Sequence, residues 1–299
     1  KRQALKHKKL LTFAGKLHIN NFSCIMANVI KIKKGLDINL KGKASDVLLN
    51  GGKSDSYAIV PDYYNGIVPK VVAKVGEKVK AGSVLMIDKN RPEIKFVSPV
   101  SGEVTAVNRG EKRKVLSVVV KPEAQIEYED FGKKNVASLK REEVKEAILH
   151  AGMWPFIKQR PYDIVASPAD EPRDIFVSAF YSAPLAPNFD FVVKGQEVDF
   201  QTGLDALAKL TDGKVYVGIR KGSSVSVKGV ETVEVEGPHP AANVGVQINH
   251  IKPINKGEVV WTVNPADVIV IGRLFNKGIA DFSRLVVITG SETTERGYV

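Results

Sequence analysis

Two stretches decide the fold of the first half of the chain: VGEKVKAGSVL, residues 75–85, and SPVSGEVTAV, residues 98–107. Both place glycines between short apolar runs. A further turn, Asn108-Arg109-Gly110, is followed by the apolar run 115–120. Short β segments separated by glycine turns are typical of a small sandwich or barrel. We therefore expect a β-rich domain over residues 26–125.

The two stretches together resemble the paired half-motifs of the biotinyl/lipoyl-like barrel-sandwich domain. In that family the modified lysine lies at a hairpin tip between the halves, and Lys89 is the candidate here. Lys89 follows Gly82 by seven residues and precedes Gly102 by thirteen, and the biotin-type Met-Lys-Met is absent. We therefore interpret the domain as a structural barrel with a solvated lysine, and a carrier modified at Lys89 stays as an alternative.

The segment before the barrel predicts little regular structure. Residues 29–40 alternate apolar and polar side chains around Gly35, which predicts a strand, a turn and a second strand. Gly51-Gly52-Lys53-Ser54 is similar to the end of a phosphate-binding loop, but Val47 stands where the first glycine is required. We interpret this short run as a flexible turn.

Residues 126–283 predict a Rossmann-like α/β domain. A helix over 138–149, capped by Ser138 and stopped by Gly152, opens it. Buried-type strands at 174–180 and 215–219 flank a helix at 196–210, an order that favours a parallel sheet. No GxGxxG sequence opens a helix, so the dinucleotide-binding fingerprint is missing.

The rest of the second half carries weaker patterns. Residues 225–235 read as strands, and residues 267–272 as a strand or a helix edge. The apolar run 284–290 begins a new β-rich element, which we assign to the start of a β-grasp (SLBB-like) domain over 284–299. The fold class expected for the whole chain is therefore mixed α/β and β (α+β).

Composition excludes several classes of protein. Apolar residues make up 43% and charged residues 26% of the 299 positions, a globular balance. The net charge of +11 is concentrated in residues 1–25, which hold six cations and no acid. After residue 25 no basic stripe interleaved with aromatics appears, so we expect no nucleic-acid binding. The single cysteine, Cys24, cannot build a disulfide or an Fe–S cluster alone.

The basic leader, residues 1–25, is expected to lie upstream of the true start, which we assign to Met26. No window approaches the ~18 consecutive apolar residues of a membrane-spanning helix. No metal-binding HExxH and no nucleophile elbow occur, and spacing favours no carboxylate pair. The residues therefore argue against a self-contained enzyme, with no catalytic residue, metal ligand or cofactor site in this chain.

Two loops are candidates for ligand binding. The loop at 153–162 combines aromatic side chains with Lys158 and Arg160, and an apolar slot with a few donors suits an uncharged quinone ring. The alternative is that Trp154 and Phe156 only seal the barrel against the α/β domain. The loop at 62–69 holds two adjacent tyrosines before Asn-Gly and reads either as a contact loop or as a hairpin turn. The candidate quinone-binding residues are Tyr64, Gly66, Ile67, Trp154, Phe156, Arg160, Pro161 and Tyr162.

From Met26 to Val299 the chain resembles the A subunits of the sodium-translocating NADH:quinone reductases (Na+-NQR). The resemblance rests on short stretches that occur in order along the chain. They are Ile32–Asp37, Lys95-Phe96, Ser98-Pro99, Ser101-Gly102, Val107–Arg113, Gly152–Trp154, Arg160-Pro161, Leu210–Tyr216, Gly237–Ala241, Asp267–Ile269 and Gly272–Phe275. Each is weak alone, and together they are specific.

The resemblance implies a peripheral protein of the cytoplasmic face of the bacterial inner membrane, docked on the membrane subunits of a six-subunit sodium pump, chiefly the B subunit. It implies that electrons pass from NADH through FAD, FMN and Fe–S centres of partner subunits to ubiquinone, with no redox cofactor in this chain. Quinone binding is implied near the segments that match Val60–Ile67 and Phe156–Asp163. Alternatives are a biotinyl- or lipoyl-type carrier fused to an α/β module and the C subunit of an Rnf-type electron-transport complex.

Overall fold

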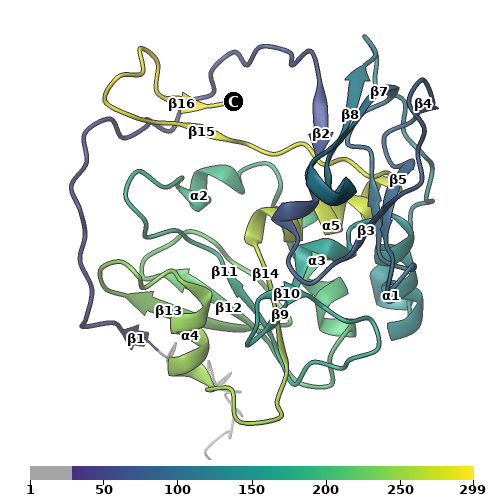
Figure 1. Cartoon of the computed structure of the whole chain (residues 1–299). Helices are drawn as coiled ribbons and strands as arrows, with labels where there is room; N and C mark the ends of the chain where they lie inside the picture. Colours follow the sequence, from purple (N-terminus) through teal and green to yellow (C-terminus); the bar gives the residue numbers. More distant parts are fainter. Residues whose placement is uncertain (1–28) are drawn as a thin grey trace, which may run out of the picture.

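The computed structural model describes residues 29–299. The barrel and the α/β domain lie side by side, and the segment 32–56 runs as an extended arm around one side of the molecule (Figure 1). The expectations for the leader 1–25, with Cys24 and the start at Met26, lie outside the described residues. Within 29–299 no helix combines the length and the apolar character needed to cross a bilayer.

The barrel consists of two antiparallel sheets, as the glycine-punctuated pattern predicts. Its strands are β2 (Tyr57–Ile59), β3 (Pro69–Val71), β4 (Lys78–Val79), β5 (Val84–Asp88), β6 (Lys95–Val97), β7 (Gly102–Arg109) and β8 (Val115–Pro122). One sheet has the order β2-β8-β7-β4 and the other β3-β5-β6. Between them lies a small core that includes Leu85, Val104 and Val118, all three fully buried. Lys89 is exposed at the turn after β5.

The α/β domain is built on a seven-stranded sheet of order β1-β13-β12-β11-β14-β9-β10. Its strands are β1 (Val29–Lys31), β9 (Ile157–Arg160), β10 (Ile164–Val165), β11 (Ile175–Ser178), β12 (Val215–Arg220), β13 (Glu231–Glu236) and β14 (Val260–Val263). The strands β1, β13, β12, β11 and β14 run parallel, whereas β9 and β10 are antiparallel. The predicted parallel sheet is confirmed, with two antiparallel strands added at one edge.

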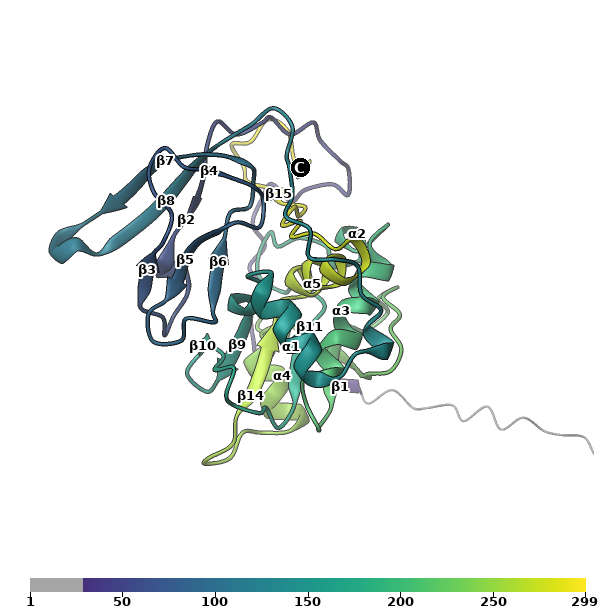
Figure 2. The same ribbon diagram turned by 90° about the vertical axis from the view of Figure 1, so that its right-hand side faces the viewer.

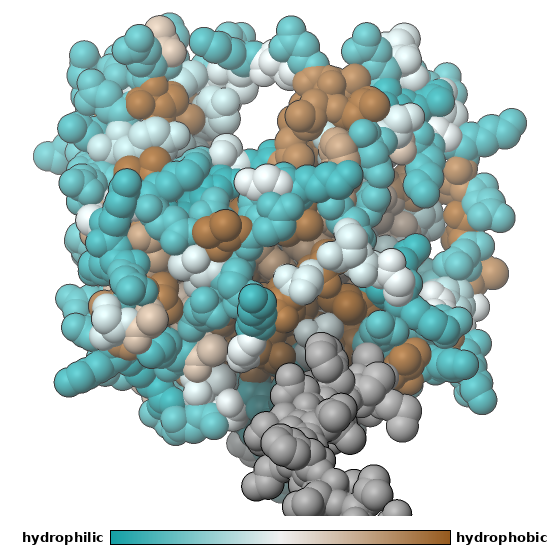
Figure 3. Space-filling view, turned by 180° about the vertical axis from the view of Figure 1, so that it is seen from behind, coloured by the Kyte–Doolittle hydropathy of each residue, from teal (hydrophilic) through white to brown (hydrophobic). Residues whose placement is uncertain are grey.

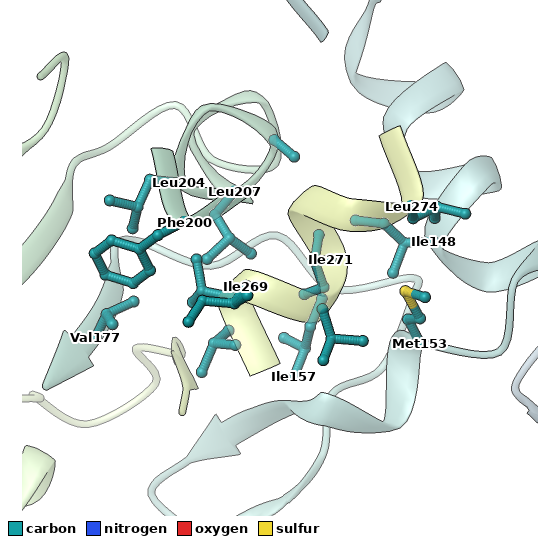
Figure 4. Packing of buried hydrophobic residues seen from close by; sticks show 14 of the residues in the cluster. Ile148, Met153, Ile157, Val177, Phe200, Leu204, Leu207, Ile269, Ile271 and Leu274 are labelled. Carbon is teal, nitrogen blue, oxygen red and sulfur yellow. The ribbon is translucent and has the colours of Figure 1, made fainter. Parts of the chain in front are cut away.

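The helices are α1 (Arg141–His150), α2 (Phe189–Val192), α3 (Glu197–Lys209), α4 (Val244–Ile251) and α5 (Pro265–Lys277). In Figure 4, α5 lies in the middle of the core, with side chains of α3 on one side and those of α1 and β9 on the other. Two glycines allow α3 and α5 to touch. A Cβ on Gly272 would lie 1.7 Å from the Asp199 carbonyl oxygen, and one on Gly203 would lie 2.0 Å from that of Val268.

Several local predictions are corrected by the structure. The second strand expected within 29–40 is absent from the described elements, because Leu36, Ile38 and Leu40 lie in the exposed arm without a pairing strand. Of the residues expected to form strands at 225–235, only 231–235 do so, as part of β13 (Glu231–Glu236). Residues 267–272 lie inside α5, because Asn264 caps the helix and Pro265 takes its first position.

The N-terminal cap predicted for α1 is also wrong. Ser138 belongs to a short 3-10 turn, η3 (Val136–Ser138), and its hydroxyl donates to the Asn135 carbonyl. The helix begins three residues later, where the Lys140 backbone N–H donates to the Glu143 carboxylate at 2.7 Å. Gly152 does end the helix, with φ +68° just beyond it, as predicted.

Beyond α5, β15 (Val287–Ile288) pairs antiparallel with β16 (Gly297–Tyr298). The arm runs alongside β16, because Leu48 and Tyr298 form a parallel bridge in which the Leu49 N–H donates to the Tyr298 carbonyl at 2.7 Å. Seen from behind, the surface is mostly hydrophilic, with apolar residues in separate patches (Figure 3). The remaining 3-10 turns are η1 (Pro61–Tyr63), η2 (Glu111–Arg113) and η4 (Trp154–Phe156).

Candidate functional site

A cavity of about 670 Å³ opens at the carboxyl ends of β11 and β14. From β11 the chain moves outward to β12 and β13, and then crosses back to form β14 on the other side of β11. Ligands of open α/β sheets bind at such a reversal of strand order, outside the carboxyl ends of the strands. The cavity is also flanked by the starts of α4 and α5, at Asn243 and Asn264. The topology therefore makes this cavity the candidate ligand site.

Strand β9 forms one wall of the cavity through alternate residues. Phe156, Lys158 and Arg160 line the cavity. Ile157 is fully buried in the core, and the Gln159 amide group bonds to Asp170 and to the Ser167 backbone, away from the cavity. Side chains in a strand point alternately to opposite faces, which explains this division. The aromatic and cationic residues noted in the sequence thus reach the cavity as one row.

Lys158 is the central cation of this wall. Its ammonium lies 5.2 Å from the ring centroid of Tyr64, which belongs to the barrel. Burial lowers the pKa of Lys158, against the opposing effects of the Asp163 and Asp267 carboxylates. A lysine in this environment is a good hydrogen-bond donor to a carbonyl oxygen and gives up its proton more readily than a solvated one.

Asp267 faces Lys158 from the first turn of α5. Burial raises the pKa of Asp267, and the nearby cations Arg284 and Lys158 oppose that rise. Arg284 Nη1 lies 3.0 Å from Asp267 Oδ1. A carboxyl group with a raised pKa in a cavity is a frequent feature of functional sites.

Two tyrosines lie near this carboxyl group: Tyr181 lines the cavity, and Tyr64 lies beside Lys158. The Tyr181 hydroxyl, in the loop after β11, donates to Asn264 Oδ1 at 3.2 Å. Burial, followed by the Asp267 charge, raises the pKa of Tyr181 to about 12 and raises the pKa of Tyr64. Both phenols therefore stay protonated near neutral pH and keep a hydrogen to donate.

The structure brings together only part of the predicted set. Phe156 and Arg160 line the cavity, and Arg160 Nη2 lies 3.4 Å from Asp163 Oδ1. Arg160 Nε is buried and has no hydrogen-bond partner among the described residues. Trp154 is instead fully buried, donates to the Ala166 carbonyl at 2.8 Å and meets Trp261 edge-on. Trp154 therefore packs inside the α/β domain and does not line the cavity.

The other predicted residues lie around the cavity rather than in it. Tyr64 packs edge-on against Phe96, and Ile67 is partly buried against the main core. Gly66 adopts φ +81°, and its carbonyl accepts from Arg91. Tyr162 is 80% exposed, and the bond before Pro161 is cis.

Sequence reasoning missed Asp267, Tyr181 and Asn264. A signal for two of them was present, because Asn264-Pro265-Ala266-Asp267 directly follows the apolar run of β14 and has the composition of a helix start. Tyr181 carried no comparable signal, since its position depends on the tertiary contact between two loops. Among residues 29–299, no cluster of three His, Cys, Asp or Glu side chains is arranged to hold a metal ion.

Comparison with known proteins gives two family matches. Residues 30–123 match the model of the NqrA N-terminal barrel-sandwich hybrid domain, and residues 139–280 match that of the NqrA second alpha/beta domain. Both matches agree with the two architectures described above.

Three similar proteins from different bacteria share the same name. The chain is 37% identical over 272 residues to the A subunit of the Na(+)-translocating NADH-quinone reductase of Neisseria meningitidis serogroup A, a match that covers 89% of this chain and 61% of that protein. It is 38% identical to the protein of the same name from Hahella chejuensis, over 88% of this chain and 60% of that protein. It is 35% identical to the protein of the same name from Yersinia pseudotuberculosis, over 89% of this chain and 61% of that protein. The chain thus spans about three fifths of the length of the curated relatives it matches.

Proposed function

Because this chain belongs to the family of A subunits of the Na+-translocating NADH-quinone reductases, we propose that it serves as the A subunit of such a complex. In this role it docks on the membrane subunits at the cytoplasmic face of the inner membrane, chiefly on the B subunit. Electrons travel from NADH through FAD, FMN and Fe–S centres of the partner subunits. Residues 284–299, which include β15 and β16, begin a third, β-grasp domain in this proposal.

We further propose that this chain binds no flavin or nicotinamide cofactor of its own. The turn after β11 reads Ala179-Phe180-Tyr181-Ser182-Ala183-Pro184, without a glycine. At this place in a dinucleotide-binding sheet, glycines let the backbone approach the phosphates. Phe180 and Tyr181 stand in place of such glycines here, which supports a role for the sheet other than nucleotide binding.

We propose that the cavity at the carboxyl ends of β11 and β14 contributes to ubiquinone binding. The observation that carries this proposal is the convergence of two apolar rings, Phe156 and Phe180, with the polar side chains Lys158, Arg160 and Tyr181 around a cavity of about 670 Å³. Ligand cavities of about 300–1,000 Å³ usually join an apolar lining to a few polar groups. The ring of a quinone packs against Phe156, and its carbonyl oxygens accept hydrogen bonds from Lys158 and Arg160, whose Nε has no partner among the described residues.

Calorimetric titration with a short-chain ubiquinone tests the quinone site. Phe156→Ala and Lys158→Met should each weaken binding by about tenfold, the equivalent of about 1.4 kcal/mol. Tyr162→Ala, on an aromatic ring outside the cavity, is the matched control and should leave the affinity unchanged. Equal affinity in all four proteins, or no binding by the parent chain, would refute the quinone site without touching the family assignment.

One observation favours a second function. Lys89 lies exposed at the turn after β5, and its backbone N–H donates to the Val68 carbonyl at 2.7 Å. A carrier lysine needs such an exposed turn. Intact-mass spectrometry of protein purified from its native host separates the two functions, because a covalent adduct on Lys89 supports the carrier and an unmodified mass supports the quinone-reductase role.

A further inference from the structure

The hairpin of β7 and β8 extends beyond the rest of the barrel (Figure 2). Its tip, residues 109–114, reads Arg-Gly-Glu-Lys-Arg-Lys and holds four cations against one acid. The four cationic side chains are all exposed. The tip is therefore a strongly positive projection on a molecule whose charges are otherwise mixed after residue 25.

The tip has a defined conformation. The Lys114 N–H donates to the Glu111 carbonyl at 3.0 Å, and the Gly110 N–H donates to the Lys114 carbonyl at 2.8 Å. Arg109 Nη1 donates to the Arg113 carbonyl at 3.2 Å. These bonds fix the backbone of the tip, so the four cationic residues lie together at the end of two paired strands.

Two of the cations occupy positions that turn chemistry does not favour. Lys112 has φ +51° and Arg113 has φ +61°, both in the left-handed region. Hairpin turns with two such residues strongly prefer Asn or Asp followed by Gly. The presence of lysine and arginine there has no explanation in the turn itself, which points to a role for their charge.

The charges are largely unneutralised within the chain. Among residues 29–299, the only ion pair made by a tip cation joins Lys114 Nζ to Asp62 Oδ2 at 2.7 Å. Arg109, Lys112 and Arg113 form no ion pair with a described residue. Three positive charges therefore remain free to meet an external negative surface.

Exposed apolar side chains accompany these cations. Leu116, two residues beyond the tip, is 42% exposed, and Tyr63, next to Asp62 in η1, is 79% exposed. The ion pair between Asp62 and Lys114 ties η1 to the tip. A tyrosine and an aliphatic side chain beside a group of cations form a combination typical of surfaces that lie on lipid headgroups.

We propose that the β7–β8 hairpin tip, with Leu116 and Tyr63, binds the anionic phospholipid surface of the membrane. The cations pair with lipid phosphates, while the two apolar side chains enter the boundary between headgroups and acyl chains. This inference rests on the proposed place of the chain at a membrane complex. It adds a second contact, with lipid, to the docking on membrane subunits.

Co-sedimentation of the full chain with vesicles tests the proposal, using phosphatidylcholine alone and phosphatidylcholine with phosphatidylglycerol at 3:2. Binding should require phosphatidylglycerol and should weaken as salt is raised, because surface charges are screened. Each cation near an anionic surface contributes about a fivefold gain in partition. The triple variant Arg109→Glu, Lys112→Glu, Arg113→Glu should therefore partition about a hundredfold less.

A matched control separates the hairpin from general charge. Lys133→Glu, Lys194→Glu, Lys256→Glu removes three exposed lysines of the α/β side and changes the net charge equally. Both triple variants are also made with the six cations of residues 1–25 changed to glutamine, so that the leader does not dominate binding. Thermal unfolding verifies that each variant is folded. The double variant Leu116→Ser, Tyr63→Ser should lower partition by about tenfold.

The outcomes divide cleanly. Loss of vesicle binding in the hairpin variant and its retention in the control support the lipid contact. Equal loss in both variants, or no loss in the hairpin variant, overturns it. Unchanged vesicle binding with weakened assembly onto the membrane subunits also overturns it and assigns the tip to an acidic protein surface, while the docking proposal survives.

Discussion

The two edges of the parallel sheet each hold a buried aspartate, and the pKa values of the two side chains are shifted in opposite directions. At the amino edge, before β11, Asp174 is 1% exposed and accepts hydrogen bonds from Arg173, Lys252 and the Lys214 backbone. These bonds hold the pKa of Asp174 below its usual range, although burial acts in the opposite direction. At the carboxyl edge, burial raises the pKa of Asp267 beside a cavity.

The difference teaches which edge serves stability and which can serve a ligand. A carboxylate with several fixed donors stabilises the fold and has no capacity left for a ligand. A carboxyl group with fewer partners, beside a half-buried lysine and two protonated tyrosines, keeps its capacity to exchange a hydrogen bond. We call the amino edge closed, because the partners of its carboxylate lie within the protein, and the carboxyl edge open, because its carboxyl group lies beside a cavity.

The largest expected effect tests the packing near the closed edge. Trp154→Ala should lower the free energy of unfolding by about 4 kcal/mol, because it leaves a cavity beside Trp261 and removes the donor to the Ala166 carbonyl. Urea unfolding measures the change. Tyr162→Ala, in the same loop but 80% exposed, should cost less than about 0.5 kcal/mol. Similar losses in both variants would refute the division of this loop into core and surface.

The next effect concerns the closed-edge carboxylate. Asp174→Asn should cost about 3 kcal/mol at pH 7, because Arg173 and Lys252 lose their common anion. Since the folded pKa is lowered, this stability is fully present above the ordinary aspartate value of about 3.9 and is lost as the pH falls through the folded pKa. Urea unfolding of parent and variant between pH 7 and pH 3 should show a constant difference that shrinks only at the acid end.

A third test addresses the seam where the barrel meets β10. Gly66 and Gly76 both have positive φ, at +81° and +85°. A Cβ on Gly66 would lie 2.8 Å from the Ile164 Cβ, whereas one on Gly76 would meet no described atom within 4 Å. Gly66→Ala should therefore cost about 2 kcal/mol and Gly76→Ala about 1 kcal/mol. Thermal unfolding measures both, and a larger loss for Gly76→Ala would contradict the seam.

The smallest change in stability is expected for Asp267 at the open edge, and its pH dependence should be opposite to that of Asp174. Asp267→Asn should change stability by less than about 1 kcal/mol at pH 7. A raised folded pKa means that the native state holds the proton longer than the unfolded state, so the parent loses stability as pH rises above about 3.9. The variant should gain on the parent in urea unfolding as the pH rises above about 3.9. If the parent instead became more stable than the variant as the pH rises, Asp267 would be a stabilising carboxylate like Asp174.

Most of the fold was predictable from local patterns. Glycine-separated apolar runs indicated the barrel, and the order of strand, helix and strand indicated the parallel sheet, because these signals lie within about ten residues. The antiparallel strands β9 and β10 were not foreseen, since Lys158, Gln159 and Arg160 do not form an apolar strand pattern. Their place depends on pairing with β14, about a hundred residues later.

The candidate site was predictable only along β9. Because side chains in a strand alternate between two faces, the sequence places Phe156, Lys158 and Arg160 on one face and Ile157 on the other. The sequence does not show which of the two faces meets a cavity. Trp154 resembled a binding residue because the loop around it combines aromatic and cationic side chains. Its burial depends on contact with Trp261, which lies in β14. The helix start at residues 264–267 could be read from the sequence, but the buried environment of Asp267 depends on Lys158, about a hundred residues earlier, and on Arg284.

Protection of Lys158 tests the open edge most directly. Its lowered pKa should let an amine-reactive acylating reagent label it at a lower pH than a solvated lysine, and peptide mass spectrometry reports the labelling rate at each lysine. With a saturating short-chain ubiquinone, labelling of Lys158 should slow at least about fivefold while that of exposed Lys133 and Lys256 stays the same. An unchanged rate at Lys158 under saturating quinone would contradict the assignment of this cavity as the ligand site.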